Sequence, residues 1–125
     1  MTLYDDLRTS ELSISKEKDG TIQAVFCFDQ SLKVFEGHFP GKPILPGIFQ
    51  FEMVRYAVEK ISGSSLQIQS IQKSKFPARI YPGEKIYISI KLSEGNQSYK
   101  IRATIKTGEL ISGKLNMTLF ECVKE

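Results

Sequence analysis

Residues 35–47 read FEGHFPGKPILPG and lead directly into a segment with helical periodicity. This stretch contains the only histidine of the chain, His38, together with three of its five prolines and three of its nine glycines. Proline fixes the backbone angle φ and removes an N–H donor, whereas glycine permits φ values that other residues avoid. The composition therefore predicts a loop with a defined path that ends at the N-terminus of a helix.

The segment 48–61 that follows the loop has the apolar spacing of a helix, with repeats at i, i+3 and i+4. Its apolar residues cover most of the helix circumference: Ile48, Phe49, Phe51, Met53, Val54, Ala57, Val58 and Ile61. A helix with so little polar surface is expected to be enclosed by other structure. The pair Ser62-Gly63 marks its C-terminal end.

The rest of the chain has mainly the alternating pattern of half-buried strands. Six strands are predicted, at residues 11–17, 21–29, 66–76, 85–92, 99–106 and 111–119, and a short helix at residues 2–8. Most are joined by tight turns such as Asp19-Gly20, which favour antiparallel neighbours. One sheet with an apolar face and one apolar helix bury each other, so we expect a single α+β domain over residues 1–125, its sheet curled around the helix.

The composition limits the cellular setting and the kind of partner. The net charge of +3 is too small to indicate nucleic-acid binding but suits an acidic partner. Cys27 and Cys122 have no motif spacing, and we expect them to be reduced thiols of a cytoplasmic protein. The sequence shows neither a secretory signal nor an apolar run approaching the ~20 residues of a membrane span.

Three groups close together in the sequence indicate acid/base chemistry. His38 has the one side chain whose unperturbed charge change falls near neutrality. Glu52 follows fourteen residues later, and it could act as an acid at neutral pH if Phe49 and Met53 shield it. The Gly47 N–H at the helix start can stabilise charge that develops on a carbonyl oxygen. The set suits proton abstraction beside a carbonyl with loss of a hydroxyl group.

The simpler interpretations of these residues remain open at this point. A single histidine is most often structural, and a glutamate early in a helix most often complements the helix dipole. The sequence shows no arrangement for a serine or cysteine nucleophile, no metal-ligand cluster and no phosphate or dinucleotide loop. Pattern and spacing alone therefore indicate an α+β domain with a candidate acid/base site.

Residues 37–47, GHFPGKPILPG, followed by Glu52, resemble the signature of the 3-hydroxyacyl-[acyl-carrier-protein] dehydratases of the FabZ/FabA kind. Residues 75–76 and 81–84 and the last strand around Gly113 are also similar to that family. The resemblance covers roughly residues 11–121 and implies the hotdog fold. It also implies dehydration of a 3-hydroxyacyl thioester to a trans-2-enoyl thioester in fatty-acid or related lipid biosynthesis.

The resemblance also implies roles for individual residues. His38 would remove the C2 proton, Glu52 would protonate or hold the departing 3-hydroxyl, and the Gly47 N–H would polarise the thioester carbonyl. In the family the histidine and the acid of one site come from different subunits, so we expect a homodimer, a trimer of dimers, or a heterodimer with a related subunit. The substrate would hang on the phosphopantetheine of an acyl carrier protein, and no metal or redox cofactor is expected.

The acyl chain would lie in an apolar tunnel along the central helix, lined here by Phe39, Pro46, Ile48, Phe49 and Met53. Family members usually continue from the glutamate with small residues and a glutamine, whereas this chain has bulkier side chains at residues 53–56. The difference favours a paralogue that serves a specialised pathway, such as polyene or other lipid-tail synthesis.

A basic segment offers a docking site for the acidic carrier protein. Its four cations are Lys73, Lys75, Arg79 and Lys85, against one nearby acid, Glu84. A solvated surface is the competing interpretation.

Two other functions on the same fold remain as alternatives. A hotdog thioesterase would hydrolyse the thioester, but such enzymes generally lack the His-Phe-Pro-Gly loop. A non-catalytic or partner-dependent subunit would retain the fold only, which the presence of both His38 and Glu52 disfavours.

Overall fold

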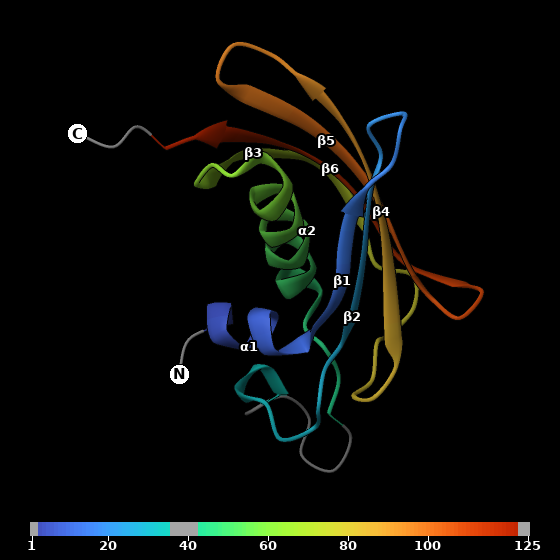
Figure 1. Ribbon diagram of the computed structural model, residues 1–125. Helices are drawn as coiled ribbons and strands as arrows, with labels where there is room; N and C mark the ends of the chain where they lie inside the picture. Colours follow the sequence, from blue (N-terminus) through green and yellow to red (C-terminus); the bar gives the residue numbers. More distant parts are fainter. Residues whose placement is uncertain (1–2, 36–42, 123–125) are drawn as a thin grey trace.

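The computed structural model describes residues 3–35 and 43–122 of the chain (Figure 1). The elements, in chain order, are α1 (Leu3–Ser10), β1 (Glu11–Lys16), β2 (Ile22–Cys27), the 3₁₀ helix η1 (Lys33–Phe35), α2 (Gly47–Ser62), β3 (Leu66–Lys75), β4 (Lys85–Glu94), β5 (Ser98–Thr107) and β6 (Leu110–Glu121). The six strands form one sheet in the order β1-β2-β4-β5-β6-β3. Every neighbouring pair is antiparallel, so the predicted α+β sheet is confirmed.

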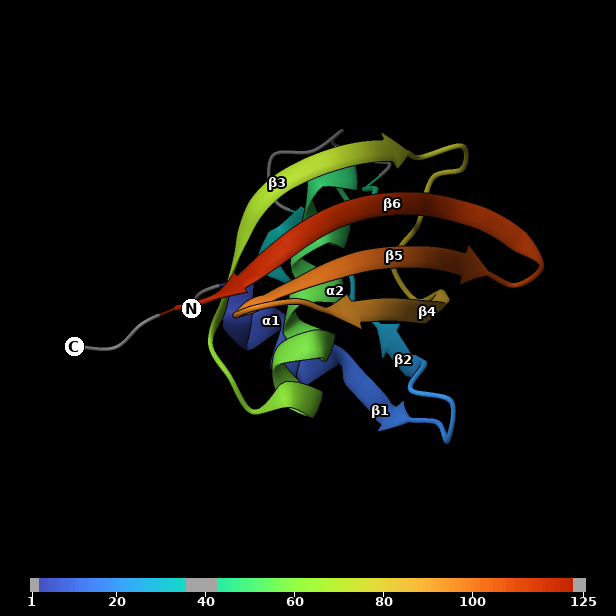
Figure 2. The same cartoon turned by 90° about the horizontal axis from the view of Figure 1, so that it is seen from above.

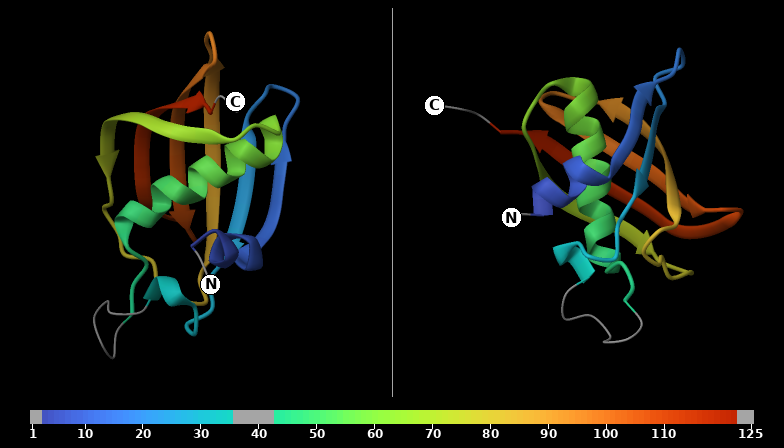
Figure 3. Two further views of the ribbon diagram at one scale, coloured as in Figure 1. Left: turned by 90° about the vertical axis from the view of Figure 1, so that its left-hand side faces the viewer. Right: turned by 60° about the horizontal axis from the view of Figure 1, so that its bottom comes forward.

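The sheet curves around α2, which lies against its concave face (Figures 2 and 3). Eight residues of α2 are buried: Phe49, Gln50, Phe51, Met53, Val54, Tyr56, Ala57 and Val58. The prediction of an enclosed helix is therefore confirmed. The helix ends at Gly63, whose φ of 74° is left-handed and whose N–H donates to the Glu59 carbonyl at 2.8 Å. Glycine adopts this conformation without the steric cost of a Cβ atom.

Alternating side chains of the strands fill the space between the sheet and α2. In β2 and the residue after it, the predicted inward set is fully buried: Ile22, Ala24, Phe26 and Phe28. In β4 the residues Ile86, Ile88 and Ile90 are 0–1% exposed. Phe28 also meets Phe49 of α2 edge to face, with 5.5 Å between ring centroids. This contact fixes the first turns of α2 against β2.

Three strands depart from strict alternation, and in β1 the register shifts between Glu11 and Ser13. In β3 the register shifts between Ile68 and Ser70 and again between Ile71 and Lys73, where the apolar alternation of residues 66–76 also breaks, near Ser70-Ile71. In β6 the shift opposite residues 105–106 buries two consecutive residues, Ser112 and Gly113. Simple alternation over residues 111–119 predicts that Ile111 shares the inner face with Gly113, and this is wrong because Ile111 pairs with the outward-facing Lys106.

The strand β3 ends the sheet on the side opposite β1, so one of its edges has no neighbouring strand in the described chain. Most of its residues are exposed, among them Ile71 at 48%. An exposed edge of this length is a template for pairing with another chain. Among the described residues, none of the helices has the length and apolar character needed to cross a bilayer.

Candidate active site

The N-terminus of α2 has no side-chain cap. Pro46 occupies the N-cap position in an extended conformation, and no side-chain hydrogen bond caps the helix there. The Phe49 N–H donates to the Pro46 carbonyl at 3.1 Å, while the Leu45 N–H donates to the Ile80 carbonyl at 2.8 Å and fixes the approach to the helix. The first backbone N–H groups of a helix have no partner within the helix. Together with the helix dipole they can receive negative charge beside Gly47.

Gly47 allows an aromatic ring to lie against the start of α2. An ideal Cβ placed on Gly47 would lie 3.0 Å from Cδ2 of Phe76, closer than ordinary contacts allow. Phe76 follows directly after β3 and meets Phe51 edge to face, with 5.8 Å between centroids. Glycine is therefore needed here for close packing. The ring of Phe76 shields one side of the helix terminus from water.

Glu52 lies on α2 just after the helix start, with a side chain that is 31% exposed. Its Oε2 accepts hydrogen bonds from Nε of Arg55, at 3.0 Å, and from Nη2 of the same side chain. Arg55 Nη1 also donates to the Leu66 carbonyl at 3.0 Å and lies 3.9 Å from Glu59. Within one copy of the chain, Arg55 therefore fixes the orientation of the Glu52 carboxyl group through hydrogen bonds to Oε2. The i, i+3 spacing of the two residues was the sequence signal for this pair.

The predicted tunnel residues separate into two groups. Phe49 and Met53 are 3% and 0% exposed and belong to the core beneath α2. Ile48 is 75% exposed, and Pro46 is half-buried at the same end of the helix. Ile48 therefore presents apolar surface beside Gly47. Phe39 and His38, the predicted base, lie outside the described residues.

Gln50 is a buried polar residue near the same helix terminus that sequence reasoning did not assign. Its side chain is 2% exposed, and its Oε1 has no hydrogen-bond partner in the described chain. The amide fits against Gly113 of β6, where an added Cβ would overlap Gln50 Oε1 and lie 3.2 Å from Cδ1 of Ile105. The glycine of β6 thus makes room for the amide. No sequence pattern could have paired residues so far apart.

A family model described as the ApeI dehydratase matches residues 14–114 of the chain. The chain belongs to the ApeI-like dehydratase family. Among curated relatives, the 3-hydroxyacyl-[acyl-carrier-protein] dehydratase FabZ of Levilactobacillus brevis is 27% identical over 127 residues, covering 94% of this chain and 79% of that protein. The predicted resemblance to FabZ-type dehydratases is thereby confirmed.

Two solved structures resemble this ApeI-like chain in fold. The dehydratase heterocomplex ApeI:P from Xenorhabdus doucetiae matches with a TM-score of 0.73 and 22% identity, covering 89% of this chain and 96% of that one. An uncharacterized protein from Erwinia carotovora subsp. atroseptica matches with a TM-score of 0.70 and 24% identity, covering 92% and 98%. With the antiparallel sheet around α2, these matches establish the predicted hotdog fold.

The four basic residues predicted to dock a carrier protein come from two strands and the segment between them within the ApeI-like domain. Lys73 and Lys75 lie on β3 and border a hollow that also involves Arg102 and Lys114. Arg79 lies in the segment between β3 and β4, and Lys85 begins β4, opposite Cys27. The docking role of these four residues stays a prediction. Among the described residues, no three His, Cys, Asp or Glu side chains are grouped as a metal site would need.

Proposed function

We propose that this protein dehydrates 3-hydroxyacyl-[acyl-carrier-protein] to the trans-2-enoyl thioester in fatty-acid or related lipid biosynthesis. The family match and the FabZ relatives support this class of reaction over thioester hydrolysis. The structural observation behind the proposal is the uncapped α2 terminus at Gly47, with Glu52 five residues further along the same helix. A helix terminus of this kind suits a thioester carbonyl that gains negative charge in the reaction.

The proposed reaction is an elimination in which each group has one task. His38 removes a proton from C2, and the electron pair of the broken C–H bond forms the C2–C3 double bond. The C3–O bond breaks, and the departing hydroxyl takes a proton from Glu52 and leaves as water. The thioester carbonyl accepts a hydrogen bond from the Gly47 N–H while it carries negative charge. Carbon is neither oxidised nor reduced overall, so this step requires no redox cofactor.

The pairing of Glu52 with Arg55 makes its proposed role depend on Arg55. A carboxyl group held in a charge-assisted hydrogen bond is fixed in orientation by its partner. We propose that Arg55 positions Glu52 toward the departing 3-hydroxyl group of the substrate. Arg55 would then be a positioning residue, whereas Glu52 contacts the departing hydroxyl.

A complete site is proposed to need two copies of the chain or one copy and a related subunit. The free edge of β3 offers a surface for such an assembly. The solved ApeI:P structure is titled a heterocomplex, which gives a precedent for unlike subunits in a related dehydratase. The substrate is proposed to arrive on the phosphopantetheine of an acyl carrier protein in the cytoplasm. A homodimer, a trimer of dimers and a heterodimer remain alternative assemblies.

The proposal is tested by the reverse reaction, hydration of a trans-2-enoyl thioester, followed as loss of enoyl absorbance. His38→Ala and Glu52→Ala should each lower kcat/KM by roughly 10²–10⁴-fold, the usual effect of removing a general acid or base. Glu109→Ala, a change of an exposed carboxylate in the β5–β6 turn, serves as the control and should retain activity. Release of free thiol without hydration would instead indicate a thioesterase. Unchanged rates in both variants would overturn the proposed chemistry.

Acyl-chain preference is a separate part of the proposal. The bulky residues at positions 53–56 support a specialised substrate, because Met53 and Tyr56 are fully or almost fully buried around α2. Hydration rates should then be higher for polyunsaturated enoyl thioesters than for saturated ones of equal length. A preference for ordinary saturated chains would show that the protein serves general fatty-acid synthesis.

A further inference from the structure

The outer face of the sheet, opposite α2, carries a large excess of positive charge. Besides Lys85 at the start of β4, seven of the seventeen lysines and arginines extend from β3, β4, β5 and β6 on this face and are exposed: Lys73, Lys75, Lys91, Lys100, Arg102, Lys106 and Lys114. None of the seven forms an ion pair with another described residue. Acidic residues near this basic outer face lie at its margins, with Asp19 in the β1–β2 turn close enough to interact with Lys91, and Glu94 and Glu109 at strand ends.

The strand register places like charges directly opposite each other on this face. Lys91 of β4 pairs with Arg102 of β5, and Lys75 of β3 pairs with Lys114 of β6. Like charges in directly opposed positions destabilise an antiparallel pair. Two such pairs within one sheet lower the free energy of unfolding. A surface that contacts only solvent gains nothing in return for this loss of stability. Binding to a polyanion would offset this cost because it neutralises the repelling cations.

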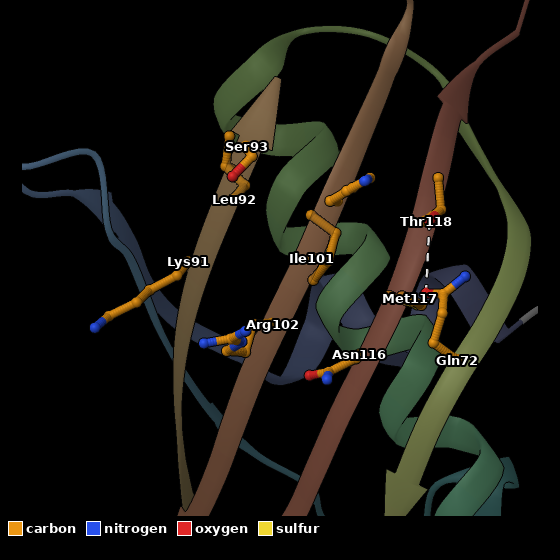
Figure 4. Close-up of a pocket in the computed structure, with 10 residues that line it drawn as sticks. Gln72, Lys91, Leu92, Ser93, Ile101, Arg102, Asn116, Met117 and Thr118 are labelled. Atoms are coloured by element: carbon orange, nitrogen blue, oxygen red, sulfur yellow. Dashed lines mark hydrogen bonds between the residues drawn. The ribbon is translucent and has the colours of Figure 1, made fainter. Parts of the chain in front are cut away.

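Two hollows lie on the same basic outer face. The larger, of about 600 Å³, is lined by residues of β3, β4, β5 and β6, and the smaller, of about 290 Å³, by residues of β3, β5 and β6. Figure 4 views the larger one from outside the sheet, with α2 behind the strands and Lys91 and Arg102 at its side. Arg102 and Asn116 line both hollows, and no acidic residue lines either one. The hollows can therefore take anionic groups between the outward side chains of these strands.

The distribution of the cations favours an extended anionic surface over a single anionic group. They spread over four neighbouring strands, about 14 Å across, and over about 20 Å along β5, as estimated from strand spacing and rise. Six of the seven are lysines, which act as point charges, whereas specific recognition of phosphate favours the fork of arginine. No large exposed aromatic cluster for stacking nucleic-acid bases accompanies the cations in the described chain, where Tyr87 is the one exposed aromatic residue of β4 and β5.

We propose that the basic outer face binds the headgroups of an anionic phospholipid bilayer. The face lies on the side of the sheet away from α2 and its N-terminus, so membrane contact leaves the candidate active site free (Figure 1). Basic residues near an anionic bilayer each strengthen binding by roughly five-fold, and the effect weakens as salt rises. Seven cations on one face are therefore enough for reversible peripheral binding. The inference does not depend on the proposed reaction, because it involves none of the residues that act on the substrate; Lys73 and Lys75 are shared only with the predicted carrier-protein contact.

The test is co-sedimentation of the full chain with vesicles of phosphatidylcholine alone and of phosphatidylcholine with 30% phosphatidylglycerol. Binding should require the anionic lipid and should fall steeply between about 50 and 300 mM salt. Arg102→Glu with Lys114→Glu should weaken binding at least ~25-fold, from two contributions of about five-fold each. A milder pair, Arg102→Gln with Lys114→Gln, should weaken it in the same direction.

The matched control reverses two exposed cations on the helices, Arg8→Glu on α1 with Lys60→Glu on α2. This control should bind anionic vesicles within about two-fold of the unchanged chain. Equal binding to neutral vesicles, no binding at low salt, or equal losses in both double variants would overturn the proposal. Tighter binding to a DNA duplex or an acidic protein than to vesicles would assign the face to another class of partner and would also overturn it.

Discussion

The contact between Gln50 and Gly113 gives the sharpest test of the packing beneath the candidate site. The change is Gly113→Ala, which adds one methyl group where the Gln50 amide lies. Gly113 lies in the interior of β6 opposite Ile105, and its φ is not in the left-handed region. A strand interior normally favours alanine over glycine on backbone grounds. The glycine is therefore expected to be required for space and not for backbone conformation.

The expected size of the effect follows from two opposing contributions. Overpacking a buried site by a methyl group costs typically about 1–3 kcal/mol. Replacing glycine by alanine returns about 0.4–1 kcal/mol, because the unfolded chain loses conformational freedom. Gly113→Ala should therefore lower the free energy of unfolding by about 1–2 kcal/mol. For a chain of this size, each kcal/mol corresponds to roughly 3–6 °C in Tm.

The assay is urea unfolding of Gly113→Ala, Gln50→Ala and the double variant. Gln50→Ala removes the amide that the new methyl group meets, so the double variant should be more stable than the sum of the single effects by about 1–2 kcal/mol. The control is Gly108→Ala, at a glycine with φ of 61° and no atom within 4 Å of the added Cβ. Its cost arises from the backbone, so it should combine additively with Gln50→Ala. Additive effects for the Gly113 pair would refute the packing argument.

Three further predictions concern other parts of the molecule. Arg55→Ala removes the donor shared by Glu52 and the Leu66 carbonyl. The free energy of unfolding, measured with urea, should fall by about 1 kcal/mol, and kcat for enoyl hydration should fall as well. Burial, with the hydrogen bond to Glu11, raises the pKa of the Tyr56 phenol well above its usual value. Above about pH 10 the native state therefore retains a proton that the unfolded chain loses. The free energy of unfolding should then fall by up to about 1.4 kcal/mol per pH unit, and Tyr56→Phe should reduce this slope. Lys114→Gln should raise stability by about 0.2–1 kcal/mol in thermal unfolding at low salt, since it removes a like-charge pair.

The sequence was sufficient for the elements whose pattern is local. Alternation in residues 85–92 and 99–106 predicted the inner faces of β4 and β5, and the Ser62-Gly63 pair predicted the end of α2. The register shift in β6 was not predictable, because it depends on how β5 and β6 align across the sheet. As a result Ser112, whose hydroxyl lies 2.6 Å from that of Thr107, is buried where alternation predicted an outward residue.

The candidate site was predictable only in part, for a related reason. The proximity of Gly47 and Glu52 follows from one helix, so sequence spacing was enough to bring them together. The contact of Phe76 with Gly47 and the slot that Gly113 gives to Gln50 are tertiary, and no local pattern encodes them. The four cations proposed as one docking patch were grouped by sequence separation. The sheet adds Arg102 and Lys114 of other strands beside Lys73 and Lys75, which no sequence separation could indicate.

The central claim is that the imidazole of one copy and the carboxyl group of another act on the same acyl chain. The most direct test mixes inactive His38→Ala with inactive Glu52→Ala and measures enoyl hydration after subunit exchange. If each site takes one group from each copy, random mixed dimers contain one intact site, and about a quarter of the wild-type activity should return at equal mixing. No recovery in mixtures shown to have exchanged subunits would contradict the account.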